Sequence, residues 1–547
     1  MRIKTYPLCL SVFLSLFLII ILSTCKKKDK KEETPFQVEK IKQISKEDAK
    51  RRQIKSKPKD FTAATYPTNS QSIRNLEQDI IVYFSREVKP DDFSFTIRPD
   101  PGEWKASWEN MGRQVNLRHE NPFSQAVQYE FEIVVRSENI KKSIHFTAYG
   151  PSTLQKIEED ETKGLIDLDT AWLYRLQTLF EPEKLPSKYQ SPTPLYCGTG
   201  VMQDFQQISE KLKPQTLMNL KPYLVRPDHP ESIYSNNNNP FADGGFKGGF
   251  HLHSIANEEE ERPSGLEKDP LLCKTGPMSI WYMKGQKDKA EETRDYLDMG
   301  NYYGLFKNLL GKEPLSDGNL EDKGRDGRLD IYLVPIGANR ETLKVLGFCC
   351  PLQSGRTGPA YIKIKISLRG AVLDTTLAHE LFHAFQFAFD QEEARWWLES
   401  TAVWAEDLSN PTRNREQNHL MDAFRWPEHR LETLTEWNFR QEYGMYLFPF
   451  YLKREFGAEK IAEIWKACET TDALDAVDKN VPKGLEECFK HFALLNLDLG
   501  PYEGSYDDHN GPLELYVYHG AYDFSLLSVG KNSKNFPLPP LSATYTR

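Results

Sequence analysis

The sequence predicts an α+β multidomain protein, and three observations carry that prediction. Short alternating apolar segments fill residues 66–150, helix and strand patterns alternate over residues 276–500, and a chain of 547 residues is too long for one hydrophobic core. Apolar residues make up 39% of the chain and charged residues 27%, which is the composition of folded domains. We therefore expect an N-terminal β-sandwich, followed by a mixed domain whose C-terminal part is mostly helical.

The N-terminus has the pattern of an export signal over residues 1–24. Arg2 and Lys4 precede an apolar run that is shorter than the roughly 20 residues a spanning helix needs. The ending Leu-Ser-Thr-Cys resembles the cleavage box of bacterial lipoproteins, although Thr24 departs from the Gly, Ala or Ser usual there. The resemblance implies that Cys25 is lipidated and that the protein is extracytoplasmic, anchored to a bacterial outer membrane or cell surface. An uncleaved anchor and plain secretion are the alternatives.

The segment from 66 to 150 carries the β pattern. Alternating runs such as 129–135 are separated by Pro- and Gly-containing turn clusters, which predicts an antiparallel β-sandwich. The run 82–90, together with Trp108 and Tyr129, resembles the bacterial Ig-like domains found on exported proteins. This resemblance implies either a spacer or a binding module.

Composition also divides the rest of the chain. Residues 25–65 are rich in Lys, Glu, Ser and Pro without a sustained period, which predicts a flexible tether. We expect a helical and loop-like connecting region over residues 151–275 and a C-terminal tail over residues 501–547. The net charge is −9, and the densest basic run, residues 26–31, lies beside the apolar N-terminus. Nucleic acid is therefore not expected as a partner.

Six cysteines remain when Cys9 and Cys25 are set aside. In an exported chain this even count is compatible with up to three disulfides. We expect the adjacent Cys349 and Cys350 to form two separate bridges that leave one loop, rather than a redox pair. No Cys-x-x-Cys spacing occurs, so a thiolate metal site is not expected.

The chemistry is concentrated in a predicted helix over residues 374–386. His379 and His383 stand one turn apart on the same face, where two imidazoles can share one cation. Glu380 is displaced around the helix from His379 and can instead reach a metal-bound water, as a general base must. The alternative interpretation is an amphipathic helix with two half-exposed histidines.

A second apolar helix, predicted over residues 396–404, is interrupted by one acid, Glu399. A carboxylate among tryptophans is costly to bury unless a cation compensates it. We therefore expect Glu399 to be the third protein ligand. The alternative is an acid at a helix start, favoured there by the helix dipole.

The stretch 374–407 resembles the gluzincins, the class of zinc metallopeptidases that includes thermolysin. The resemblance implies a zincin domain over residues 276–500, with His379, His383 and Glu399 holding one catalytic Zn²⁺ and Glu380 activating water.

This sequence departs from the thermolysin-like pattern at one position. Thermolysin-like sequences carry an acid four residues after the ligand glutamate to orient a histidine, but Val403 stands there in this chain. We propose that Glu406, one turn further along the same face, takes that role.

Just before the metal helix, Ile362, Lys363, Ile364 and Lys365 alternate strictly. The pattern predicts a strand with its isoleucines inward and its lysines outward. In zincins the strand before the metal helix is commonly the cleft edge that pairs with an extended substrate. The alternative interpretation is an edge strand whose lysines prevent aggregation through strand pairing. A substrate-binding strand could also have this protection, so the two interpretations are compatible.

Upstream, Asp322, Asp326 and Asp330 are arranged around a turn glycine much as at the start of an EF-hand loop. The closing glutamate is missing because Leu333 takes its place, so the segment is either a Ca²⁺ site or a tight polar turn. Downstream, Tyr443 begins a predicted buried helix. It is either an oxyanion donor during hydrolysis or an aromatic packing residue.

These observations predict an extracytoplasmic zinc endopeptidase that acts on protein or peptide substrates and is held to a membrane by its lipid anchor. Two other functions remain open. One is a surface binding or adhesion lipoprotein with a catalytically silent zincin body. The other is a zinc hydrolase of a non-peptide substrate, which would use the same ligands.

Overall fold

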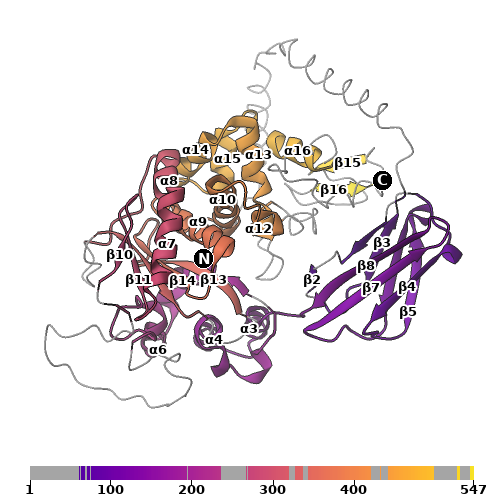
Figure 1. Cartoon of the computed structure of the whole chain (residues 1–547), viewed down its shortest axis with the longest axis horizontal. Coiled ribbons are helices and arrows are strands. Elements are labelled where there is room, and N and C mark those ends of the chain that lie inside the picture. Colours follow the sequence, from indigo (N-terminus) through magenta and orange to yellow (C-terminus); the bar gives the residue numbers. More distant parts are fainter. Residues whose placement is uncertain are drawn as a thin grey trace, which may run out of the picture. The chain divides into compact units, whose positions relative to one another are not determined.

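The computed structural model describes residues 61–235, 266–318, 327–336, 343–419, 431–432, 441–497, 526–529 and 543–546, apart from residues 62, 68–70, 74, 85, 194 and 268 (Figure 1). The predicted signal peptide, Cys25 and nearly all of the predicted tether lie outside these residues. Within them, no helix combines the length and the apolar character that crossing a bilayer requires.

The N-terminal part consists of two four-stranded sheets with a shared core. One sheet has the order β1–β3–β6–β5 and is antiparallel throughout, whereas in the other, β2–β8–β7–β4, strand β2 runs parallel to β8. The strands are β1 (Ala63–Tyr66), β2 (Gln71–Ile73), β3 (Ile80–Phe84), β4 (Phe93–Arg98), β5 (Trp104–Glu109), β6 (Gln114–His119), β7 (Val127–Val135) and β8 (Ile140–Ala148).

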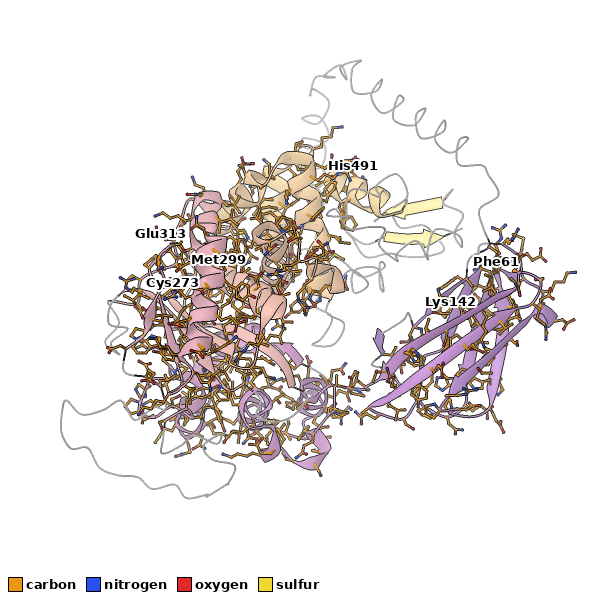
Figure 2. The ribbon with its side chains drawn as sticks, viewed as in Figure 1. Phe61, Lys142, Cys273, Met299, Glu313 and His491 are labelled. Carbon is orange, nitrogen blue, oxygen red and sulfur yellow. The ribbon has the colours of Figure 1, made fainter. Side chains whose placement is uncertain are left out.

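The alternation seen in the sequence explains this core. In β7 every second residue from Tyr129 to Val135 is buried, and these side chains meet inward residues of the other sheet such as Val82 and Leu117. Lys142 of β8, labelled in Figure 2, donates a hydrogen bond to the carbonyl of Ala63 at 3.1 Å. Strand β1 begins at Ala63, inside the segment 25–65 predicted to be a tether.

A six-stranded mixed sheet organises the remainder, in the order β10–β11–β12–β14–β13–β9. Strands β11, β12 and β14 run parallel, β10 and β13 are antiparallel to their inner neighbours, and β9 is parallel to β13. The strands are β9 (Leu195–Cys197), β10 (Leu271–Leu272), β11 (Met278–Tyr282), β12 (Leu329–Val334), β13 (Leu343–Pro351) and β14 (Ala360–Lys365).

Helices cover both faces of this sheet, which is why all six residues of β12 are buried. One face packs against α3 (Thr153–Thr162), α4 (Leu168–Phe180), α5 (Thr199–Ile208) and α6 (Pro214–Leu224). The other face packs against the layer begun by α7 (Lys287–Gly300), α8 (Tyr302–Leu310), α9 (Gly370–Gln386) and α10 (Arg395–Ser409).

The C-terminal part is helical. It contains α12 (Gln441–Gly444), α13 (Leu447–Phe456), α14 (Glu459–Cys468), α15 (Ala473–Asn480) and α16 (Gly484–Leu497). In the predicted tail, β15 (Leu526–Val529) pairs antiparallel with β16 (Ala543–Thr546). The expectation of a mixed chain with N-terminal β-sheets and a helical C-terminal region is confirmed.

The structure adds to one expectation about the chain's middle part and contradicts another. Residues 151–275 contain the expected helices but are more than a connecting region, because β9 and β10 complete the two edges of the sheet and α3 to α6 cover one of its faces. Cys349 and Cys350 lie in β13 rather than in a loop. The described cysteines Cys273 (Figure 2), Cys349, Cys350, Cys468 and Cys488 are buried free thiols.

The strand predicted from the alternation at residues 362–365 exists as β14, but it is not an edge strand. It pairs with β12 on one side and with β13 on the other. Ile362 and Ile364 face the layer that contains α9, as expected, whereas Lys363 faces the opposite helices and is 0% exposed. Alternation in the sequence separates the two faces of a strand but does not show which face is exposed to water. The exposure of Lys363 is therefore decided by the tertiary packing of β14.

The buried ammonium of Lys363 lies in an aromatic cage. Its Nζ is 4.7 Å from the ring centroid of Phe180, 5.2 Å from that of Phe348, 5.4 Å from that of Tyr361 and 5.6 Å from that of Tyr234. The rings attract the cation, but removal from water disfavours it. Burial lowers the pKa of Lys363 to about 8.

This burial predicts a pH-dependent stability. Between about pH 8 in the folded state and about pH 10.4 in the unfolded state, only the unfolded chain keeps the Lys363 proton, so stability rises with pH. We expect the free energy of unfolding of the wild type to gain about 1.4 kcal/mol per pH unit over a Lys363→Met variant in this window. Denaturant titrations of both proteins from pH 7 to 10 measure it. Parallel pH profiles would show that the lysine stays charged in its cage.

Candidate metal centre

Helix α9 follows β14 after a short turn, and every residue from Leu373 to Gln386 is buried. It begins at Gly370, earlier than the predicted start at residue 374. Burial along its length places the polar groups of His379 and His383 out of water, where they need partners.

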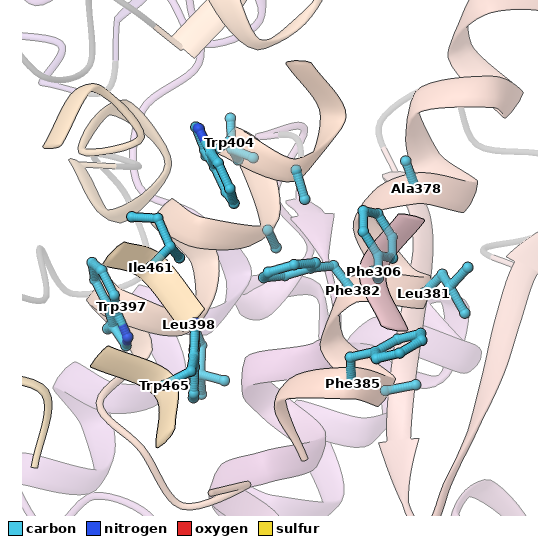
Figure 3. Close-up of a cluster of buried hydrophobic side chains, with 14 of the residues drawn as sticks. Phe306, Ala378, Leu381, Phe382, Phe385, Trp397, Leu398, Trp404, Ile461 and Trp465 are labelled. Carbon is cyan, nitrogen blue, oxygen red and sulfur yellow. The ribbon is translucent and has the colours of Figure 1, made fainter. Parts of the chain in front are cut away.

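Helix α10 packs across α9 through large aromatic side chains (Figure 3). The ring of Phe382 lies 5.0 Å from that of Phe306 in α8 and 6.3 Å from that of Trp404 in α10, measured between centroids. Trp397 of α10 stacks on Trp465 of α14 at 6.1 Å. These contacts hold the two helices in one relative position, and so hold the polar residues between them.

The structure brings His379, His383 and Glu399 together between these helices. Their ligand atoms all lie within 4.8 Å of one another, and among the residues that the structure describes they are the group of three that could hold a metal ion. The two Nε2 atoms are 3.2 Å apart. Oε2 of Glu399 lies 3.3 Å from Nε2 of His379 and 3.6 Å from Nε2 of His383.

Hydrogen bonds on the far side of each imidazole determine its tautomer. Nδ1 of His379 lies 3.0 Å from Oε1 of Glu406, and a carboxylate only accepts, so this Nδ1 carries the proton. Nδ1 of His383 lies 2.6 Å from Oε1 of Gln386. The Gln386 amide nitrogen donates to the carbonyl of Leu398 at 2.9 Å and to Oγ1 of Thr401 at 2.8 Å, so its oxygen is the atom that faces His383.

Both Nε2 atoms therefore present lone pairs toward Glu399. Its Oε2 accepts no hydrogen bond from any residue that the structure describes. Burial by itself raises the pKa of Glu399, but the positive charge that the facing imidazoles of His383 and His379 carry when they are protonated lowers it below its ordinary range. For bonds of 2.0–2.1 Å to zinc, the edge of a tetrahedron is about 3.3 Å. Donor type and donor spacing thus fit a zinc ion.

Glu380 lies beside this group and is equally enclosed: the exposed fractions are 6% for His379, 2% for Glu380, 0% for His383 and 2% for Glu399. Burial raises the pKa of Glu380, while the two histidines act in the opposite direction. Its Oε2 accepts a hydrogen bond from Oγ1 of Thr199 at 3.2 Å. A carboxyl with a raised pKa beside a candidate metal site is suited to receive and return a proton.

Tyr443 lies in α12, partly buried, with its ring stacked on His379 at a centroid distance of 6.2 Å and an interplanar angle of 12°. The ring of His419, at the end of the 3₁₀ turn Glu416–His419, also stacks on the ring of Tyr443, with a centroid distance of 5.2 Å. The structure thus places the ring of Tyr443 next to that of His379, a candidate metal ligand, and its role as an oxyanion donor stays a prediction.

The remaining predicted residues lie elsewhere. Asp322 and Asp326 of the predicted calcium loop lie outside the described residues. Asp330 lies in β12, where it accepts a hydrogen bond from Nε1 of Trp281 at 2.7 Å and lies 3.7 Å from the guanidinium of Arg226. Burial raises the pKa of Asp330 to about 7. These partners are those of a buried structural carboxyl.

Sequence reasoning missed Gln386 and Thr199. Gln386 lies three residues after His383, a spacing at which helix side chains meet, so the sequence did carry a signal for it. Thr199 is far from Glu380 along the chain, and no local pattern announces their contact.

The comparisons with known proteins add no family. No protein-family model matches the chain, and no curated protein matches it. Among solved structures, CopC from Methylosinus trichosporium OB3b matches with 17% identity and a TM-score of 0.13, over 16% of this chain and 88% of CopC. A TM-score of that size carries no conclusion about the fold, family or activity of this chain.

Gln386 provides a test of how the site is built. We expect Gln386→Leu to weaken zinc binding about 10- to 100-fold, because His383 loses the acceptor that orients it. Competition with a chromogenic chelator measures the zinc dissociation constant. Gln391→Leu is the matched control, since the Gln391 amide is also buried but donates to the carbonyls of Gln353 and Gly355. Equal zinc affinity in both variants would contradict the role given to Gln386.

Proposed function

We propose that this protein is a zinc-dependent endopeptidase. The observation that carries the proposal is the convergence of three lone-pair donors, on His379, His383 and Glu399, at spacings of 3.2–3.6 Å that match the edges of a zinc tetrahedron. Three protein ligands leave a fourth coordination position, as in catalytic rather than structural zinc sites. The resemblance of residues 374–407 to gluzincins supports the same assignment.

Each residue of the site has a role in peptide hydrolysis. A zinc ion bound there would polarise the scissile carbonyl and acidify water. Glu380 takes the proton from the attacking water and passes it to the departing amine, which its raised pKa favours. Glu406 and Gln386 keep the imidazoles neutral at Nε2 and correctly oriented. Tyr443, whose ring stacks on that of His379, would donate to the oxyanion.

We further propose that the protein is a lipid-anchored lipoprotein and that its N-terminal sheets form an Ig-like domain that acts as a spacer. The export signal and the sequence ending at Cys25 support the first proposal. The alternating strands and their shared core support the second.

The enzymatic proposal is tested by separating metal binding from proton transfer. We expect Glu380→Gln to keep one equivalent of zinc by elemental analysis but to lower kcat on a denatured protein mixture by about 10²- to 10⁴-fold. Glu399→Ala should lose zinc and activity together. Glu181→Gln is the control, because Glu181 is also buried but its partner is Tyr223. Unchanged cleavage by Glu380→Gln, or cleavage insensitive to chelators, would refute the proposal.

The anchor is tested separately. We expect Cys25→Ser to move the protein from the membrane fraction to the soluble fraction of bacteria that express it, since lipid attachment at the thiol is lost. Cys9→Ser, within the apolar stretch, should leave the distribution unchanged. Membrane retention of both variants would favour an uncleaved apolar anchor.

A further inference from the structure

The strand that runs beside the catalytic glutamate is β13, not β14. A Cβ atom at Gly347 of β13 would lie 3.0 Å from Cγ of Glu380 and 3.0 Å from the carbonyl oxygen of Lys363. Glycine therefore lets α9 and β13 approach closely at this point. One side of β13 pairs with β14, so a peptide that reached Glu380 as an added strand would have to pair with the other, outer side of β13.

That outer side is taken by a segment of the same chain. Strand β9 pairs with it in parallel, with Leu195 opposite Leu343 and Cys197 opposite Gly347. The register shifts between these two positions, and β9 has three residues. The pairing is therefore short and irregular, with few main-chain hydrogen bonds to hold it against a competing strand.

Thr199, two residues after the end of β9, also contacts this side of β13. Its Oγ1 accepts a hydrogen bond from the backbone N–H of Cys349 in β13 at 3.0 Å and donates to Oε2 of Glu380 at 3.2 Å. One side chain thus uses a main-chain donor that an extended substrate would use, together with one oxygen of the proposed general base. Thr199 is 1% exposed, so solvent does not compete for these bonds.

Thr199 is the first residue of α5, and the helix beyond it is firmly held. Its apolar side chains Val201 and Met202 are buried in the core on that face of the sheet. The Gln203 amide donates to the carbonyls of Gln391 at 2.8 Å and Glu393 at 2.9 Å, and Asp204 forms an ion pair with Arg395. The helix beyond Thr199 is therefore a fixed base, and detachment from β13 is limited to residues 195–199.

We propose that residues 195–199 are an internal occupant of the substrate position, so that the peptidase is latent while β9 is paired with β13. An extended peptide competes with β9 for the outer side of β13, and its entry frees Glu380 from Thr199. This inference rests on the proposed function and states how that site is regulated.

The first experiment weakens β9 without shortening the chain, by Leu195→Gly, Tyr196→Ser and Cys197→Gly together. The control is Leu271→Gly with Leu272→Ser in β10, the short strand at the opposite edge of the same sheet. We expect kcat/KM on an unstructured fluorogenic peptide to rise at least about tenfold in the β9 variant, mainly through a lower KM, with zinc content and thermal unfolding unchanged. The β10 variant should match the wild type. Equal kcat/KM in all three proteins at full zinc occupancy overturns the inference and leaves the proposed function intact.

A second measurement needs neither turnover nor altered β9 residues. The Glu380→Gln protein is saturated with the same peptide, and amide hydrogen exchange is followed with and without it. We expect faster exchange in residues 195–199 and continued protection in residues 343–350, because the peptide replaces β9. Unchanged protection of residues 195–199 in the peptide complex overturns the inference. Absence of zinc and of chelator-sensitive cleavage in every protein, the β9 variant included, instead overturns the proposed function.

Discussion

Three electron-pair donors held 3.2–3.6 Å apart in a buried space are the constraint on which the rest of this structure depends. Two neutral imidazole nitrogens and a carboxylate oxygen repel one another unless a cation or a proton lies among them. The fold sustains this arrangement through bonds on the far sides of the same groups. Glu406 and Gln386 each hold an Nδ1–H, and so decide which nitrogen of each ring faces Glu399.

The same contacts join α9 and α10, the two helices that carry the candidate ligands. Gln386 belongs to α9 but donates to Leu398 and Thr401 of α10, so the orientation of His383 is tied to the helix that carries Glu399. Aromatic packing from Phe382 and Trp397 removes this polar group from water. The low local polarity strengthens each hydrogen bond among these buried groups. The candidate ligands therefore have little freedom to move apart.

Sheet topology gives the site its second property, its enclosure. Because β14 lies inside the sheet, the outer side of β13 is the place where an added strand would reach Glu380, and β9 lies there. The arrangement also explains Lys363, which alternation alone would place in water. With helices on both faces of the sheet, neither side of β14 is exposed, and the lysine is enclosed by aromatic rings instead.

Local pattern was sufficient for much of the site. The spacing of His379, Glu380 and His383 placed two imidazoles on one helical face, and a lone acid among tryptophans pointed to Glu399. Glu406 followed from the same helical geometry. Pattern failed where partners are distant in sequence: it could not place Thr199 on Glu380, join β9 to β13, or show that Cys349 and Cys350 stay unbridged inside a strand.

What the sequence by itself determined, then, is the local element of each candidate ligand, the alternating strands of the N-terminal sheets and the helical character of the C-terminal region. What only the tertiary structure decided is the strand order of the six-stranded sheet, the burial of Lys363 and the pairing of β9 with the outer side of β13. Helical and strand periodicities are properties of neighbouring residues, whereas strand pairing and burial depend on which distant segments close upon one another.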